Sequence, residues 1–139
     1  MMYELLCIAM AVYWEARGEP VAGQIAVAQV VMNRVNDSRY PSDACSVVYD
    51  AQYYPWRSDV PIRNQCQFSF FCDGKPDQPT DGQAWYLSQV IAQIAWEGGT
   101  LEAVNAATHY HEITVHPAWA NDGKVVATIN NHVFYSLEE

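Results

Sequence analysis

The fold expected of this chain is decided by residues 5–20, which read Leu5-Leu6-Cys7-Ile8-Ala9-Met10-Ala11-Val12-Tyr13-Trp14-Glu15-Ala16-Arg17-Gly18-Glu19-Pro20. The run from Leu5 to Trp14 carries no charge, so a helix over it would bury most of its faces. Gly18 is suited to end this helix, and Pro20 suits the first position of a second one. Glu15 is therefore expected on the last turn of a buried helix, beside two aromatic rings.

A carboxyl group in this position is expected to have a raised pKa. Partial removal from water disfavours the carboxylate, which lets a glutamate donate a proton near neutral pH. General-acid cleavage of a glycosidic bond requires such a group. The alternative is that Glu15 only marks the point where a core helix reaches the surface.

The composition predicts one domain, residues 1–139, with an ordinary hydrophobic core. Half of the residues are hydrophobic, and five Trp and nine Tyr supply aromatic faces suited to a core or to sugar rings. The net charge of −9 and the scattered basic residues argue against a nucleic-acid partner. If the substrate is a glycan of the cell wall, the negative charge of the protein would not attract it, so binding would rest on stacking and hydrogen bonds.

The first residues and the cysteines indicate where the chain is expected to work. The start lacks a basic region, and the apolar run is too short to cross a bilayer, so no signal peptide and no membrane insertion are expected. We expect a soluble monomer, or a fragment whose export signal was removed.

The cysteines are expected to differ in their state. Cys7 is expected to be a buried thiol. One disulfide among Cys45, Cys66 and Cys72 is open, since Cys66 and Cys72 could flank a hairpin.

Apolar spacing and turn signals predict a mainly helical α+β domain with small β-hairpins. Helices are expected over Tyr3–Ala16, Val21–Val35, a short segment capped by Ser42 and ending near Tyr49, Asp81–Trp96, and Thr100–Ala106. Extended segments are expected over Gln65–Phe71, Lys124–Ile129 and His132–Ser136, the last two joined by Asn130-Asn131. The rest of residues 51–80 and the segment Thr108–Asn121 are expected to be irregular.

The segment Gln65-Cys66-Gln67-Phe68-Ser69-Phe70 is a candidate partner of Glu15. Clefts of the lysozyme type set an acidic residue at a helix end against a small β unit. In an extended segment Gln67 and Ser69 would share one face and could hydrogen-bond a sugar. The alternative is a plain hairpin whose polar residues face solvent.

The histidines offer a second constellation. All of them lie in the last third of the chain, and His109, His111 and His116 could form a zinc site. However, no Glu-bearing helix of the usual zinc-hydrolase kind precedes them. We therefore favour a groove in which His109 and Tyr110 reach the substrate or Glu15.

No second carboxylate is placed opposite Glu15 by the sequence. Glu19 is best interpreted as an acid near the start of the second helix, with Arg17 as an ion-pair partner. One essential acid without a nucleophilic partner fits a lytic transglycosylase, in which the same glutamate acts first as acid and then as base.

Together these segments resemble the SleB-type cell-wall hydrolases, the family of the spore cortex-lytic enzymes and related phage lysis proteins. The likeness covers nearly the whole chain in the family's order. The matching stretches are Trp14–Pro20, Gly23–Ala28, Val30–Val35, Tyr40-Pro41, Cys45–Tyr49, Gln67–Phe70, Ala107–His111, Val115–Trp119 and Ile129–Tyr135. Phe70 stands where the family commonly has Trp, and Asn130 where it often has Gly.

The resemblance implies a lysozyme-like or lytic-transglycosylase-like fold and peptidoglycan glycan strands as substrate, cut between N-acetylmuramic acid and N-acetylglucosamine. It implies Glu15 as the acid and no metal or organic cofactor. The cleft residues that it implies are Gln67, Phe68, Ser69, Thr108, His109 and Tyr110.

Other functions remain as alternatives. A bare catalytic domain indicates a phage endolysin, which would pass from the host cytoplasm to the periplasm or cell wall. The alternatives are a metal-dependent hydrolase that uses the histidines and a non-catalytic module that binds peptidoglycan. Hydrolysis and transglycosylation both stay open.

Overall fold

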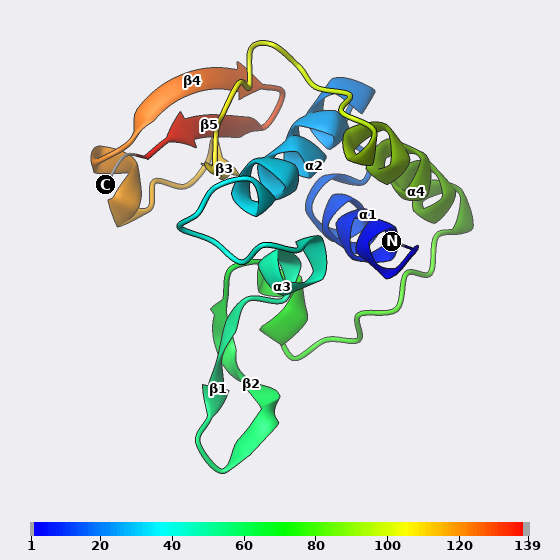
Figure 1. Ribbon diagram of the computed structural model, residues 1–139, viewed down its shortest axis with the longest axis vertical. Coiled ribbons are helices and arrows are strands. Elements are labelled where there is room, and N and C mark those ends of the chain that lie inside the picture. Colours follow the sequence, from blue (N-terminus) through cyan, green and yellow to red (C-terminus); the bar gives the residue numbers. More distant parts are fainter. Residues whose placement is uncertain (1, 138–139) are drawn as a thin grey trace.

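The helices of this protein pack into one bundle, with small antiparallel sheets beside it (Figure 1). A computed structural model describes residues 2–137, except for the side chains of residues 2, 58, 59 and 64. α1 (Met2–Ala16) packs against α2 (Val21–Val35) and α4 (Gly82–Trp96), and the short α3 (Ala44–Val48) packs on α1 and α2. The α+β class predicted from the sequence is confirmed.

The uncharged run of α1 fills the core as expected. Ile8, Ala9, Ala11 and Val12 are fully buried, and they contact buried residues of the neighbouring helices. Small residues on this face let the helix axes approach closely. Within the described residues, no helix combines the length and the apolar character that a bilayer crossing requires.

The connection between α1 and α2 is a tight turn. Gly18 has a φ of 83°, in the left-handed region that favours glycine, and the N–H of Glu19 bonds back to the carbonyl of Ala16 at 3.0 Å. Pro20 stands immediately before α2 rather than at its first position. The predicted bounds of α2 are confirmed.

Two helix ends differ from the sequence-based expectation. The cap of α3 is Asp43, not Ser42, because the Asp43 carboxylate accepts a hydrogen bond of 2.8 Å from the N–H of Ser46. The helix predicted over Thr100–Ala106 is wrong, since residues 102–106 form turns. The buried side chain of Gln29 holds this segment: its amide donates to the carbonyl oxygens of residues 101 and 105, and its oxygen accepts from the N–H of residue 101.

The first β unit is a hairpin that extends away from the helices (Figure 1). β1 (Ala51–Tyr54) pairs with β2 (Arg57–Cys66) in a region predicted to be mostly loops. The extended segment predicted over Gln65–Phe71 is therefore wrong in its second half. β2 ends at Cys66, and a 3-10 turn, η1 (Ser69–Cys72), follows it.

The second sheet has the strand order β3-β5-β4. β4 (Lys124–Ile129) and β5 (His132–Ser136) have the predicted bounds, and Asn130 in the turn between them has a φ of 53°. The segment predicted to be irregular contains β3 (His109–Glu112), which pairs with β5, and the 3-10 turn η2 (Ala118–Asn121).

The cysteines form two disulfides, Cys7–Cys45 and Cys66–Cys72. The expectation that Cys7 is a thiol is wrong. Because α3 packs on α1, the Cα atoms of Cys7 and Cys45 come within 5.1 Å, a separation that a disulfide spans. The second bridge is one of the pairings that the sequence left open, and it encloses the 3-10 turn η1, not a hairpin.

Candidate active site

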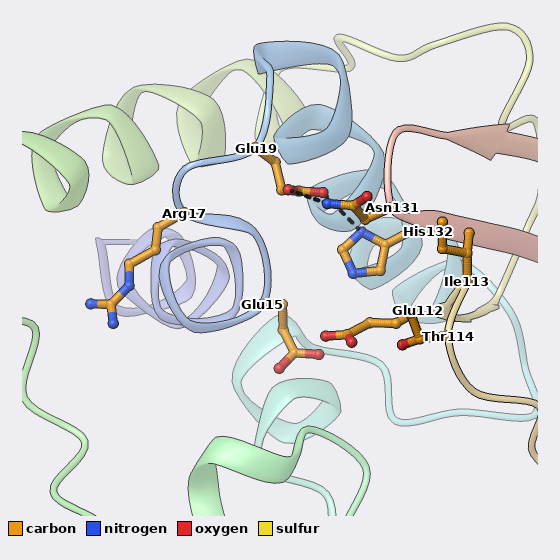
Figure 2. A pocket seen from close by; sticks show the side chains of 8 residues that line it. All are labelled: Glu15, Arg17, Glu19, Glu112, Ile113, Thr114, Asn131 and His132. Atoms are coloured by element: carbon orange, nitrogen blue, oxygen red, sulfur yellow. Dashed lines mark hydrogen bonds and ion pairs between the residues drawn. The ribbon is translucent and has the colours of Figure 1, made fainter.

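Glu15 lies where two cavities meet at the end of α1. The large cavity has a volume of ≈ 400 Å³ and the small cavity ≈ 110 Å³, and Glu15 is the side chain that lines both. The large cavity is lined by Glu15, Arg17, Glu19, Glu112, Ile113, Thr114, Asn131 and His132 (Figure 2). The small cavity is lined by Glu15, Arg34, Gln67, Phe68, His109, Tyr110 and Trp119.

Tyr110 holds the carboxyl group of Glu15. Its hydroxyl donates a hydrogen bond of 2.6 Å to Glu15 Oε1. In the sheet Tyr110 lies opposite Phe134, and its ring packs against the rings of Phe134 and His132. Burial, together with the neighbouring Glu15, raises the pKa of Tyr110 well above its ordinary value. The phenol therefore keeps its proton and remains a hydrogen-bond donor.

The environment of Glu15 raises its pKa. Removal from water is the main cause, and the charge of Glu112 acts in the same direction. The hydrogen bond from Tyr110 lowers the pKa but is outweighed. Because ionisation is disfavoured, Glu15 keeps its proton to a higher pH than an exposed glutamate does. A general acid requires this property.

The last turn of α1 is fixed by the loop that precedes α4. The hydroxyl of the fully buried Tyr13 accepts hydrogen bonds from the N–H groups of Thr80 and Asp81, at 3.2 and 3.1 Å. The indole N–H of Trp14 donates to the carbonyl oxygen of Asp77 at 2.9 Å. These bonds hold the helix end that carries the acid, so its side chain is positioned before any substrate binds.

Arg17 and Glu19 do not form the ion pair that the sequence predicted. The glycine between them has left-handed backbone, which turns their side chains to different sides. The Arg17 guanidinium lies over the ring of Tyr13, at 4.6 Å, and points away from Glu19 (Figure 2). Glu19 instead accepts a hydrogen bond of 3.2 Å from Asn131, and its Oε1 lies 3.7 Å from His132 Nδ1.

Glu112 is a second carboxylate beside Glu15 that the sequence reasoning missed. Its side chain points into the large cavity with that of Glu15 (Figure 2), and its charge raises the pKa of Glu15. A signal was available in the sequence. Side chains two apart on a strand face the same side, so placing Tyr110 against Glu15 also places Glu112 there. The prediction failed because the segment was expected to be irregular.

The structure brings together most of the residues predicted to line the cleft. The small cavity contains four of them, Gln67, Phe68, His109 and Tyr110. Ser69 does not line either cavity, because it begins η1 and not a continued strand. Thr108 is buried behind the site, where its hydroxyl lies 3.0 Å from Nδ1 of His109.

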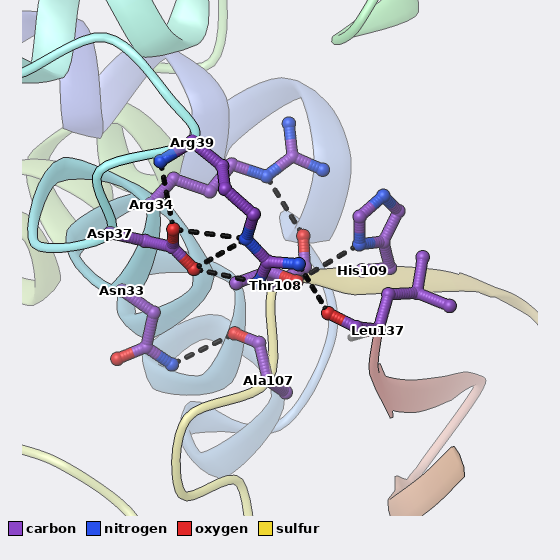
Figure 3. Close-up of polar contacts among 8 residues, drawn as sticks. All are labelled: Asn33, Arg34, Asp37, Arg39, Ala107, Thr108, His109 and Leu137. Atoms are coloured by element: carbon purple, nitrogen blue, oxygen red, sulfur yellow. Dashed lines mark hydrogen bonds and ion pairs between the residues drawn. The ribbon is translucent and has the colours of Figure 1, made fainter. Parts of the chain in front are cut away.

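Arg34 and Trp119 were not among the predicted site residues. Arg34 is only 6% exposed and reaches the small cavity from α2, where its Nε donates to the carbonyl oxygen of Thr108 at 2.8 Å (Figure 3). The ring of Trp119 packs against His109, with ring centres 5.0 Å apart. Burial, with the charges of Arg34 and Arg39, lowers the pKa of His109 to about 4, so this imidazole is neutral at pH 7.

The three histidines of the alternative metal site do not converge on one point. The ring nitrogens of His111 bond to the carbonyl oxygen of Glu112 and the hydroxyl of Tyr135, at 2.6 and 2.8 Å. His116 bonds to Asn121 at 2.9 Å. Over the described part of the chain, no group of three His, Cys, Asp or Glu side chains has a metal-binding arrangement. The geometry therefore does not favour a metal-dependent hydrolase.

Comparison with known proteins gives the family. Residues 18–135 match the family model described as Cell Wall Hydrolase. The chain belongs to the cell wall hydrolase family. The resemblance stated from the sequence is thus confirmed, although the matched stretch begins three residues after Glu15.

Individual relatives agree with this assignment. The spore cortex-lytic enzyme of Halalkalibacterium halodurans is 45% identical over 97 residues, which is 67% of this chain and 29% of that protein. The spore cortex-lytic enzyme of Bacillus subtilis is 43% identical over 47 residues, 34% of this chain and 15% of that protein. The chain thus spans less than a third of the length of these relatives.

The fold also matches solved structures. The catalytic domain of the Bacillus cereus SleB protein is 25% identical, with a TM-score of 0.70, over 98% of this chain and 91% of that chain. The catalytic domain of the germination-specific lytic transglycosylase SleB from Bacillus anthracis is 24% identical, with a TM-score of 0.74, over 98% and 96% of the two chains. The fold of this chain is that of the SleB catalytic domains.

Proposed function

We propose that this protein degrades the glycan strands of peptidoglycan, with Glu15 as the general acid and base. The observation that carries the proposal is the carboxyl group of Glu15, removed from water and hydrogen-bonded by Tyr110 at the junction of two cavities. The family assignment and the names of the relatives support a substrate in the cell wall.

The proposed reaction begins with proton transfer from Glu15 to the oxygen that links two amino sugars. The glycosidic bond breaks, its electron pair stays with that oxygen, and positive charge develops on the anomeric carbon. Glu15 is then a carboxylate, and the hydrogen bond from Tyr110 strengthens because its acceptor has become charged. The bond thus stabilises the state that forms during the reaction.

In the second step the Glu15 carboxylate takes a proton from the nucleophile, which is either water or a hydroxyl group of the substrate. With water as the nucleophile, the product has a reducing end. With the 6-hydroxyl of the muramyl residue as the nucleophile, the product has an anhydro end, as in lytic transglycosylases. Glu112 is the carboxylate that could assist a water molecule from the large cavity.

The disulfides support a site of action outside the cytoplasm. Cys7–Cys45 and Cys66–Cys72 would persist in an oxidising compartment and would be reduced by cytosolic thiols. Delivery as a phage endolysin stays a prediction from the sequence.

Digestion of purified peptidoglycan, followed by mass spectrometry of the soluble products, tests the proposed function. We expect fragments cut after the muramyl residue, with either anhydro or reducing ends. A protein that sediments with peptidoglycan but releases no soluble fragments would be a binding module, and the proposal would be wrong.

A further inference from the structure

The small cavity contains a buried cation that is not paired with any of the described carboxylates. Arg34 is 6% exposed, and its guanidinium bonds to the carbonyl oxygen of Thr108 and, at 3.3 Å, to Oε1 of Gln67. None of the described carboxylates forms an ion pair with it. Asp37, on the same stretch of chain, is bound by Arg39 instead (Figure 3).

A buried guanidinium without a carboxylate is costly unless its N–H groups find other acceptors. Arg34 uses Nε and Nη1 in its hydrogen bonds within the protein, while a guanidinium carries five N–H groups in all. Its face is covered by the rings of Tyr40 and Phe68, at 5.0 and 5.8 Å. Such a site is suited to a ligand oxygen that carries negative charge or is a strong acceptor.

The large cavity has the opposite character. Three carboxyl groups line it, those of Glu15, Glu19 and Glu112, while the guanidinium of Arg17, which also lines it, lies over the ring of Tyr13. Within it Glu19 Oε1 and His132 Nδ1 are buried 3.7 Å apart, and neither has a hydrogen-bond partner among the described residues. Acceptors and negative charge dominate this side, so a sugar that presents hydroxyl and N–H donors fits there, whereas a carboxyl group would be repelled.

The size of the small cavity limits what it can hold. Its volume of ≈ 110 Å³ is about a quarter of the ≈ 400 Å³ of the large cavity. The smaller space suits a substituent of a sugar, and the larger space suits a sugar ring. The rings of Phe68 and Trp119 supply an apolar wall for a methyl group. The ligand group therefore combines a methyl group with a carbonyl or carboxyl oxygen.

We propose that the small cavity binds the 3-O-lactyl group of a muramyl residue, and that Arg34 and Gln67 determine specificity for muramyl over glucosaminyl residues. The inference rests on the proposed function and adds the orientation of the glycan. The muramyl residue lies on the Arg34 side of Glu15, and the neighbouring glucosaminyl residue occupies the large cavity. An N-acetyl group also has a methyl and a carbonyl group, but it is neutral, whereas the lactyl group can offer a carboxylate to the Arg34 guanidinium.

Binding of two monosaccharides tests this inference. N-acetylmuramic acid and N-acetylglucosamine differ only in the lactyl group, and each is titrated into the ¹⁵N-labelled wild-type protein at pH 7. We expect N-acetylmuramic acid to bind about tenfold more tightly, since a charge-assisted hydrogen bond distinguishes it. Its binding should shift the Gln67 side-chain amide and Trp119 indole signals. N-acetylmuramyl-L-alanine, in which the lactyl carboxyl is an amide, should shift the same signals.

The variant Gln67→Glu places a carboxylate against Arg34 with almost no change in shape. We expect it to abolish the tenfold preference, and the matched charge change Gln89→Glu on the exposed face of α4 to leave the preference intact. Equal affinity of the wild type for the two sugars, or a preference that persists in Gln67→Glu, would overturn the inference. Peptidoglycan digestion is measured separately, so a failed preference in a protein that still releases fragments leaves the proposed function standing.

Discussion

The substitution Tyr110→Phe isolates the interaction that we consider most important for the acid. It removes the hydroxyl that donates to Glu15 at 2.6 Å, and it keeps the ring that packs against His132 and Phe134. In the wild type this hydrogen bond lowers the pKa of Glu15 against the larger effect of burial. Without it, the carboxylate loses its donor and the pKa of Glu15 rises further.

The expected size of the effect follows from the charge of the acceptor. A hydrogen bond to a charged group contributes about 1.5–3 kcal/mol and one between neutral groups about 0.5–1.5 kcal/mol. The difference of about 1–1.5 kcal/mol applies only after Glu15 has given up its proton, so kcat should fall about five- to tenfold. Because activity requires protonated Glu15, it declines as pH rises through the pKa of Glu15, and this decline should move to higher pH in the variant.

The assay is the rate of release of soluble fragments from peptidoglycan between pH 4 and pH 9. Tyr135→Phe is the matched control, because Tyr135 lies on the neighbouring strand and its hydroxyl bonds to His111 at 2.8 Å, whereas the Tyr110 hydroxyl bonds to Glu15. It should leave the position of the decline unchanged. If the decline in Tyr110→Phe stays in place or moves to lower pH, the assigned role of the hydroxyl is wrong.

Three further predictions concern stability and metal dependence. Gln29→Met removes three hydrogen bonds to the turn at residues 101–105 and should lower the free energy of unfolding by about 2–3 kcal/mol. Urea unfolding measures this loss, and an unchanged midpoint of unfolding would contradict the role of the Gln29 amide. Replacing Cys7 and Cys45 by Ala opens a cross-link between residues 38 apart and should cost about 4 kcal/mol in the same assay, whereas a loss below about 1 kcal/mol would speak against the bridge. Incubation with EDTA should leave lytic activity unchanged, and a loss restored by zinc would revive the histidine alternative.

The parts of the fold that the sequence predicted well are those in which local signals and burial agree. The uncharged run before Trp14 can only form a buried helix, and the alternation in β4 and β5 with a turn-prone pair between them defines a hairpin. The segment over Thr100–Ala106 failed because its backbone is held by Gln29, a residue about 70 positions away. No local pattern contains such a contact.

In the candidate site, too, the residues set by local sequence were predicted, and those set by distant contacts were missed or placed wrongly. Glu15 could be identified from its own segment, because its burial follows from the helix that carries it. Glu112 was missed because its position depends on β3 pairing with β5. Arg34 was missed because the sequence around it does not show whether a carboxylate will pair with its guanidinium. Only the folded chain shows that it is buried beside Gln67 and the carbonyl oxygen of Thr108. Ser69 was placed wrongly because the disulfide Cys66–Cys72 bends the chain into η1.

The activity and stability of Glu15→Gln test the central claim most directly. The substitution keeps the shape and an acceptor for the Tyr110 hydroxyl but removes the proton, so peptidoglycan lysis should fall at least about 100-fold. A raised pKa means that the ionised Glu15 disfavours folding at pH 7, so the variant should melt at the same or a higher temperature than the wild type. A folded Glu15→Gln variant that retains more than about a tenth of the wild-type activity would contradict the role of Glu15 as the proton donor.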